Sequence, residues 1–187
     1  FGSDHYGIKP DLITIAKGLT SAYAPLSGVI VSEKVWKILE KGSDALGAIG
    51  HGWTYSSHPL CTAAAIANLE LIDSLGLVEN AKLTGAYFKQ ALTDALAGHR
   101  IVGEVRGEGL AAAVEFVADK DDRVYFDPAL KVGPRIYAAT LARGVISRAL
   151  PQGDILGFAP PLCLTRDEAD IVVKAVAGAV ESVAAEL

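Results

Sequence analysis

Methionine is absent from this sequence of 187 residues, and cysteine occurs only twice, as Cys61 and Cys163. Because translation starts with methionine, we expect a chain that opens on Phe1 to be part of a longer polypeptide. The two cysteines lie in unrelated contexts and lack the spacing of a metal site. We expect both cysteines to be free, buried thiols in a reducing compartment, which predicts a cytoplasmic protein. We expect no metal site. The alternative for the two cysteines is a disulfide between them.

Basic runs and long apolar stretches are also absent. The formal net charge is −5 and the Lys and Arg residues do not cluster, so we expect neither a nucleic-acid surface nor a polybasic membrane patch. No apolar stretch is long enough for a membrane-spanning helix, which predicts no membrane partner. With 51% hydrophobic and 21% charged residues, the composition is typical of a folded globular protein.

The order of the local patterns predicts two domains of different class. Residues 1–75 carry short apolar segments at Leu12–Ala16 and Gly28–Ser32, which we interpret as buried parallel strands of an α/β domain. Residues 100–187 mix strand and helix patterns and predict a small α+β domain. Residues 76–99 predict the helix that connects the two domains.

Several helix and strand boundaries are marked by specific residues. Ser32 predicts the N-cap of a helix that ends at Gly42. Thr165, with acidic residues in the turn that follows it, predicts the capped start of the last helix. Residues 101–117 predict two strands around a turn at residues 106–109.

A single lysine, Lys17, follows the first predicted strand in the segment "DLITIAKGLTSAYAPLSG". Ligands of α/β sheets bind beyond the carboxyl ends of the strands. An amine at such a position is partly desolvated, which favours its neutral, nucleophilic form, and a neutral lysine forms Schiff bases with carbonyl compounds. The alternative is a lysine that only reaches solvent from a strand end.

The residues around Lys17 resemble a known family. "KPDL", "AKGL" and "APLSG" are similar to the lysine segment of class III aminotransferases, which are pyridoxal phosphate enzymes of fold type I. The resemblance implies that Lys17 forms the Schiff base with pyridoxal phosphate and later carries the proton between substrate and cofactor. It also implies that residues 1–75 are the end of the large cofactor-binding domain and that residues 100–187 are the small C-terminal domain.

A second segment, "HGWTYSSHP" at residues 51–59, resembles the same family. The resemblance implies that Thr54 binds the cofactor phosphate of the partner subunit and that Trp53 lines the partner's substrate pocket, in a homodimer with shared active sites. A hydroxyl and backbone amides beside a helix start suit a phosphate. The alternative is a Ser/Thr turn that caps the next helix, and both can hold if Ser57 or His58 provides the cap.

A third segment, "GVISRALPQGDILGFAPPLCLTRDEAD", resembles the C-terminal block of the family. In amine–pyruvate and ω-amino-acid transaminases an arginine of this block binds the substrate carboxylate, and Arg148 has that position. A guanidinium suits this role because its planar fork matches a carboxylate. Arg143 and Arg166 are the alternative carboxylate-binding arginines, but both lie at helix ends, where ordinary helix electrostatics explain them. The alternative for Arg148 itself is a surface arginine on an edge strand. Arg106 of "VRGEGL" is interpreted as part of a structural ion pair.

These resemblances together predict a transaminase that moves an amino group from an ω-amino acid or amine to pyruvate or a pyruvate-like keto acid, with pyruvate as the expected acceptor. Another pyridoxal phosphate enzyme of this class, an aminomutase or a decarboxylating transaminase, is one alternative. An inactive fragment that acts as a folding or dimerisation module is the other. In the family an acidic residue pairs with the pyridine nitrogen, and none of Asp4, Asp11 and Glu33 has the corresponding position. We therefore expect this chain alone to be incomplete as an enzyme.

Overall fold

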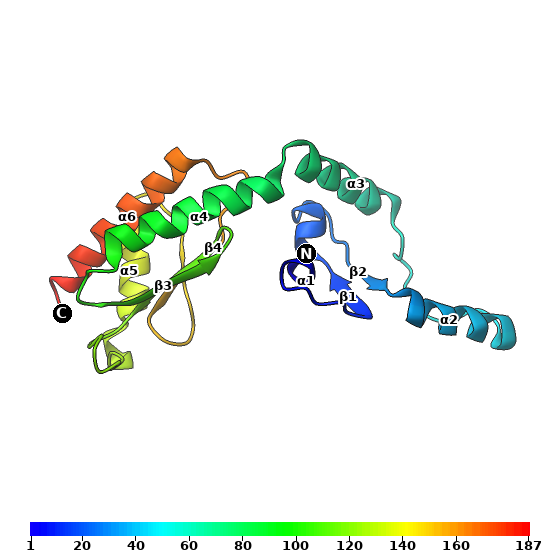
Figure 1. Ribbon diagram of the computed structural model, residues 1–187, viewed down its shortest axis with the longest axis horizontal. Coiled ribbons are helices and arrows are strands. Elements are labelled where there is room, and N and C mark those ends of the chain that lie inside the picture. The colour runs from blue at the N-terminus through cyan, green and yellow to red at the C-terminus, as the bar shows by residue number, and fades with distance from the viewer. The chain divides into compact units, whose positions relative to one another are not determined.

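The chain forms two compact units. The computed structural model covers residues 1–187, and the chain divides into Phe1–Leu75 and Gly76–Leu187 (Figure 1). Both units mix helices with antiparallel strands, so the fold is mixed α/β. The helix predicted as a connection at residues 76–99 is part of the second unit.

The first unit is built around a two-stranded sheet. Its elements are α1 (Gly2–His5), β1 (Leu12–Ile15), the 3-10 helix η1 (Lys17–Thr20), β2 (Gly28–Val31), α2 (Glu33–Leu46) and α3 (Pro59–Ser74). The prediction of buried parallel strands is wrong, because β1 and β2 are antiparallel and no residue of either strand is buried. A parallel pair needs a long crossover, usually a helix. Here the connection instead reverses the chain through Ser21 and Ala22, which both have left-handed backbone.

Helix α2 is longer than its sequence predicts. Ser32 is the N-cap, as predicted, and its hydroxyl accepts a hydrogen bond from the Val35 N–H at 3.4 Å. Gly42 does not end the helix, which continues to Leu46 and closes at Gly47 with a φ of 88°. An interior glycine costs a helix only about 0.5–1 kcal/mol relative to alanine. The helical hydrogen bonds beyond Gly42 offset that cost.

The second unit is a four-stranded sheet with helices. Its elements are α4 (Leu77–Leu96), β3 (Val102–Glu108), β4 (Ala111–Phe116), the 3-10 helix η2 (Pro128–Leu130), α5 (Val132–Leu141), β5 (Arg148–Ala149), β6 (Ile155–Phe158) and α6 (Arg166–Ala184). The strand order is β3–β4–β6–β5, and all neighbours are antiparallel. The β3–β4 turn lies at Gly109–Leu110 and not at residues 106–109, because Glu108 still pairs with Ala111. Gly109 has a φ of 54°, which a glycine adopts without steric cost.

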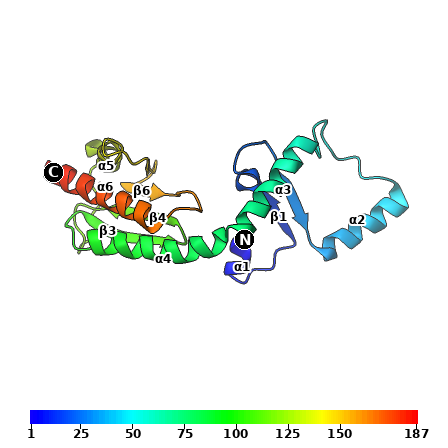
Figure 2. The same cartoon turned by 90° about the horizontal axis from the view of Figure 1, so that it is seen from above.

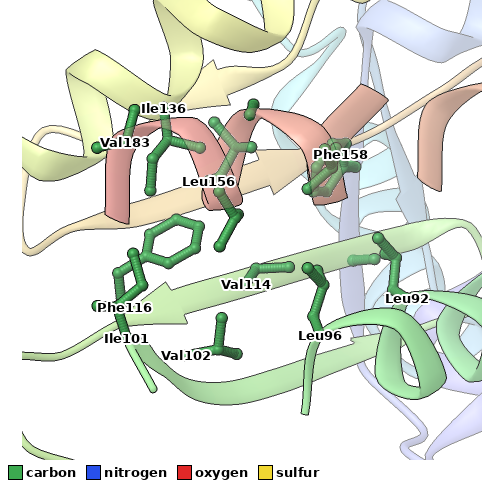
Figure 3. Close-up of a cluster of buried hydrophobic side chains, with 14 of the residues drawn as sticks. Leu92, Leu96, Ile101, Val102, Val114, Phe116, Ile136, Leu156, Phe158 and Val183 are labelled. Atoms are coloured by element: carbon green, nitrogen blue, oxygen red, sulfur yellow. The ribbon is translucent and has the colours of Figure 1, made fainter. Parts of the chain in front are cut away.

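The core of the second unit lies between the sheet and a layer of three helices. Helix α6 packs against both α4 and α5, α4 packs on β3, and α5 packs on β5 and β6. Figures 1 and 2 both show α4 and α6 side by side. Alternate residues of β4 are buried, as expected for a sheet with one covered face. Figure 3 shows the interdigitated side chains, among them Leu92, Leu96, Val114, Phe116, Ile136, Leu156 and Phe158.

The start of α6 confirms the predicted cap at Thr165. The Thr165 hydroxyl accepts from the Glu168 N–H at 3.3 Å, and the Glu168 carboxylate accepts from the Thr165 N–H at 2.8 Å. The bond from the Thr165 backbone is the main reason that the pKa of Glu168 is lowered from its ordinary value. This reciprocal pair satisfies backbone donors that a helix start otherwise leaves free.

Both cysteines are free thiols, but their predicted burial is wrong. Cys61 is half-buried in the first turn of α3, and Cys163 is exposed in the segment between β6 and α6. Cys163 is exposed because the segments that connect strands and helices run over the surface.

No single helix is both long and apolar enough to cross a membrane. Helices α3 and α4 pass the criteria of length and composition only as a bent pair, and the core helix of a water-soluble protein passes the same criteria. The most deeply buried positions of α4, such as Phe88 and Leu92, belong to the core of the second unit.

Candidate active site

Lys17 occupies a strained position at the end of β1. It is the first residue of η1, and its φ of 52° lies in the left-handed region. For a residue with a Cβ this backbone costs of the order of 1–3 kcal/mol, and it persists where the surrounding structure enforces it, often at functional sites. The buried Thr20 closes the following turn, because its hydroxyl donates to the Ala24 carbonyl at 2.6 Å.

The amine of Lys17 is exposed and makes no hydrogen bond or ion pair within the chain. The expected partial desolvation is therefore wrong for this chain. The neighbouring Ala16 and Gly18 are too small to cover the amine, and a Cβ built on Gly18 would meet nothing within 4 Å. An unpaired amine in open space, carried by a strained backbone, fits a group that binds covalently through an aldehyde, as pyridoxal phosphate does.

Trp53 and Thr54 lie on a turn that precedes α3. The Trp53 N–H donates to the Ser56 hydroxyl at 3.0 Å, and the Ser56 N–H donates to the Trp53 carbonyl at 2.9 Å. The Trp53 side chain is 75% exposed, and the exposed Thr54 hydroxyl has no partner within the chain. Both side chains are therefore free to contact a ligand or a second subunit. His58 has the N-cap position of α3, but its side chain makes no capping hydrogen bond.

Arg148 is the first residue of β5, an edge strand of the sheet in the second unit. It is exposed, and its guanidinium makes no hydrogen bond or ion pair within the chain. It lines a cavity of about 550 Å³ whose other walls are mainly apolar and include Phe88, Phe158 and Ile171. A free guanidinium beside apolar walls suits a molecule that carries both a carboxylate and an apolar part.

Arg106 confirms the prediction of a structural ion pair. Its guanidinium donates to the Glu115 carboxylate at 2.6 Å and to the Glu104 carboxylate at 2.9 Å. The hydrogen bond to Glu115 is the main reason that the pKa of Arg106 is raised. These three residues come from the paired strands β3 and β4 and tie them together on one face of the sheet.

The two arginines weighed against Arg148 are already engaged. Arg143 donates to a backbone carbonyl of α5 at 2.9 Å. Arg166 lies over the ring of Tyr87, with 5.0 Å between the guanidinium carbon and the ring centroid. Contacts of this kind hold a side chain to the protein surface. Of these three arginines, only Arg148 has a guanidinium without such a contact.

The predicted site residues are distributed over both units. Lys17, Trp53 and Thr54 belong to Phe1–Leu75, and Arg148 belongs to Gly76–Leu187. Trp53 and Thr54 share one turn, and no hydrogen bond, ion pair or ring contact joins them to Lys17. All four side chains are exposed, each within its own unit.

One residue that contacts the loop of residues 17–22, here called the lysine loop, was missed from the sequence alone. Asn68 of α3 bonds to the loop, with its amide donating to the Gly18 carbonyl at 3.0 Å. The available signal was a lone amide in the alanine-rich stretch "CTAAAIANL". That signal does not reveal the partner, because the bond joins residues 50 positions apart.

The sequence is similar to known proteins of one family. The family profile described as "Aminotransferase class-III" matches residues 1–180. A "Diaminobutyrate--2-oxoglutarate transaminase" of Halomonas elongata is 60% identical over 183 residues, which are 98% of this chain and 39% of the relative. The chain thus spans about two-fifths of the length of this curated relative.

Solved structures match all or nearly all of the length of this chain. A transaminase structure from work on directed evolution by ancestral reconstruction has a TM-score of 0.96 and 66% identity, covering 100% of this chain and 41% of that one. A thermostable (S)-enantioselective omega-transaminase from Thermomicrobium roseum has a TM-score of 0.89 and 44% identity, covering 98% of this chain and 40% of that one.

Proposed function

Because the chain belongs to the class III aminotransferase family, we propose that the whole protein is a pyridoxal-phosphate-dependent transaminase. It moves an amino group from an ω-amino acid or amine to a keto acid. The observation that carries this proposal is the unpaired, exposed amine of Lys17 on a left-handed backbone at the end of β1. This chain spans only part of the length of its relatives, so the activity is proposed for the full-length protein.

Each predicted residue has a distinct role in this proposal. When bound, the cofactor supplies an electron sink for negative charge at the substrate carbon. Lys17 would hold the cofactor through Nζ, and the same Nζ, once released, would move the proton at the substrate carbon. Arg148 would bind and orient the substrate carboxylate through its planar fork.

The proposal includes a homodimer with shared active sites. Thr54 would bind the cofactor phosphate of the partner subunit, and Trp53 would line the partner's substrate pocket. The exposed Trp53 ring and the unpaired Thr54 hydroxyl support this assignment. Light scattering on the full-length protein tests it, since a monomer that is fully active would contradict a shared site.

Two keto acid acceptors are proposed, and each has its own support. Pyruvate follows from the similarity of the Arg148 segment to amine–pyruvate transaminases. The name of the Halomonas relative favours 2-oxoglutarate instead. The full-length protein, given a donor with a terminal amine and each keto acid in turn, would form alanine or glutamate, respectively. Formation of neither amino acid from any terminal amine would contradict the proposed function.

Replacement of Arg148 tests the carboxylate role. In the full-length protein, Arg148→Ala is expected to raise KM for the keto acid about 10- to 100-fold, because charge-assisted hydrogen bonds contribute about 1.5–3 kcal/mol. The KM for a plain amine donor, which has no carboxylate, should stay unchanged. Steady-state kinetics with each substrate varied in turn measure both values.

Arg143→Ala is the matched control, because the Arg143 guanidinium bonds to the backbone of α5. It removes the same charge from a neighbouring position and should leave both KM values at the wild-type level. An unchanged KM for keto acids in Arg148→Ala would show that another group binds the carboxylate.

A further inference from the structure

The loop that carries Lys17 needs support from outside itself. Lys17, Ser21 and Ala22 have φ angles of 52°, 49° and 62°, all in the left-handed region that favours glycine. Two backbone hydrogen bonds inside the loop are long, since Ser21 N–H to Gly18 O and Ala22 N–H to Lys17 O are both 3.3 Å. A strained backbone of this kind persists only when the surrounding structure holds it.

That support comes from one side chain of α3. The Asn68 amide nitrogen donates to the carbonyl oxygens of Gly18 at 3.0 Å and Leu19 at 3.1 Å. The Asn68 amide oxygen accepts from the Ser21 hydroxyl at 2.5 Å. A flipped amide would place its oxygen against two carbonyl oxygens, so the bonding pattern defines the orientation. Asn68 thus fixes both the start and the end of the turn that follows Lys17.

Asn68 is also the polar exception on the face of α3 that packs against η1. The less exposed positions of α3 recur at helical spacing, and they are Cys61, Ala64, Ala65, Asn68 and Ile72. A polar side chain on such a face is unfavourable unless its hydrogen bonds are satisfied. The three bonds to the lysine loop satisfy it.

We propose that Asn68 is a positioning residue that fixes the backbone of the lysine loop and thereby the direction of the Lys17 amine. This inference rests on the proposed function, in which that amine holds the cofactor. The amine has no partner within the chain, so the backbone determines where it points. A displacement of about 1 Å at a reacting group costs about 100-fold in rate.

Three substitutions in the full-length protein separate the bonds. Asn68→Ala removes all three, Asn68→Asp keeps the acceptor for Ser21 but loses both donors, and Ser21→Ala removes only the bond to the amide oxygen. Two readouts are the apparent Kd of the apoprotein for pyridoxal phosphate and the pH profile of the bound cofactor's absorbance. The third is the fraction of Lys17 that borohydride traps with the cofactor, which peptide mass spectrometry measures. Both Asn68 variants should raise Kd about 10-fold or more and shift the pH profile. Ser21→Ala should change both in the same direction and by less.

Asn80 offers a matched control in the second unit. Its amide nitrogen donates to the carbonyls of Leu162 at 2.6 Å and Leu164 at 3.1 Å, and its amide oxygen accepts from the Thr84 hydroxyl at 2.9 Å. Asn80→Ala therefore loses the same set of bonds without touching the lysine loop. It should lower Tm as Asn68→Ala does and leave Kd, the pH profile and Lys17 trapping unchanged. If the Asn68 variants lower Tm but match Asn80→Ala in the other three readouts, Asn68 only supports packing and the proposal is overturned.

The wild-type protein separates this inference from the proposed function. If borohydride traps no cofactor on wild-type Lys17, the proposed function fails and the inference fails with it. If wild type and the Asn68 variants are trapped equally, with equal Kd, the inference alone fails. Ser21→Ala keeps the test decisive if the Asn68 variants do not fold, because it removes one bond at an exposed position.

Discussion

Lys17→Ala in the full-length protein is expected to abolish covalent binding of pyridoxal phosphate and to lower kcat at least about 1,000-fold. The reason is that the variant loses both the amine that holds the cofactor and the group that moves the proton, and proton transfer alone contributes about 10²–10⁴-fold. Thermal stability of the apoprotein should change little, because the Lys17 side chain is exposed and unpaired. Cofactor absorbance, borohydride trapping and steady-state rates measure these effects.

Two further variants make the result specific to the amine at this position. Lys17→Arg keeps the positive charge but not the nucleophile, so it should be as inactive as Lys17→Ala. Lys9→Ala removes another exposed lysine without a partner in the same unit and should match the wild type. If Lys17→Ala keeps the cofactor bond and the wild-type rate, a different lysine carries the chemistry and the proposed function loses its main support.

Local sequence signals predicted local structure well. Ser32 and Thr165 were correctly identified as N-caps. In an N-cap the side-chain oxygen accepts a hydrogen bond from a backbone N–H three residues later, so the cap depends only on residues that are close in the sequence. The strand segments of the first unit and the two strands within residues 101–117 were also identified, since apolar β-branched residues favour extended backbone in most settings. The end of α2 was missed because Gly42 is compatible with a helix at a modest cost.

Pairing and exposure were predicted less well, because both depend on distant residues. The apolar pattern of β1 and β2 does not encode the direction of pairing, which the turn at Ser21 and Ala22 determines. The position of the β3–β4 turn depends on the register of the two strands, in which Glu108 opposes Ala111. The segment "RGEG" at residues 106–109 has two glycines and is compatible with a turn at residues 106–109 or at Gly109–Leu110.

The candidate site shows the same contrast between local sequence signals and contacts with distant residues. Lys17 and Arg148 were found from the segments around them, which carry the family resemblance. The left-handed backbone of Lys17 and the free guanidinium of Arg148 became visible only in the structure. Asn68 was missed because its importance lies in bonds to a loop far away in the sequence.

Gly85→Ala is expected to destabilise the protein by about 3 kcal/mol, at the upper end of the usual cost of overpacking. Gly85 is buried in α4 against the β3–β4 turn, and a Cβ there would lie 2.2 Å from the carbonyl carbon and oxygen of Gly109. These are backbone atoms, and the turn cannot yield easily because Gly109 has left-handed backbone and both strands are fixed in register. Thermal or denaturant unfolding of the full chain measures the change.

Gly42→Ala is the matched control, because it makes the same change inside another helix. A Cβ at Gly42 would meet nothing within 4 Å, so only the helix preference for alanine remains. This variant should stabilise the protein by up to about 0.5–1 kcal/mol, opposite in sign to Gly85→Ala. If both variants stabilise equally, α4 does not contact the Gly109 turn in solution. If they differ as expected, the absence of a side chain at Gly85 is required for the close packing of α4 on the Gly109 turn.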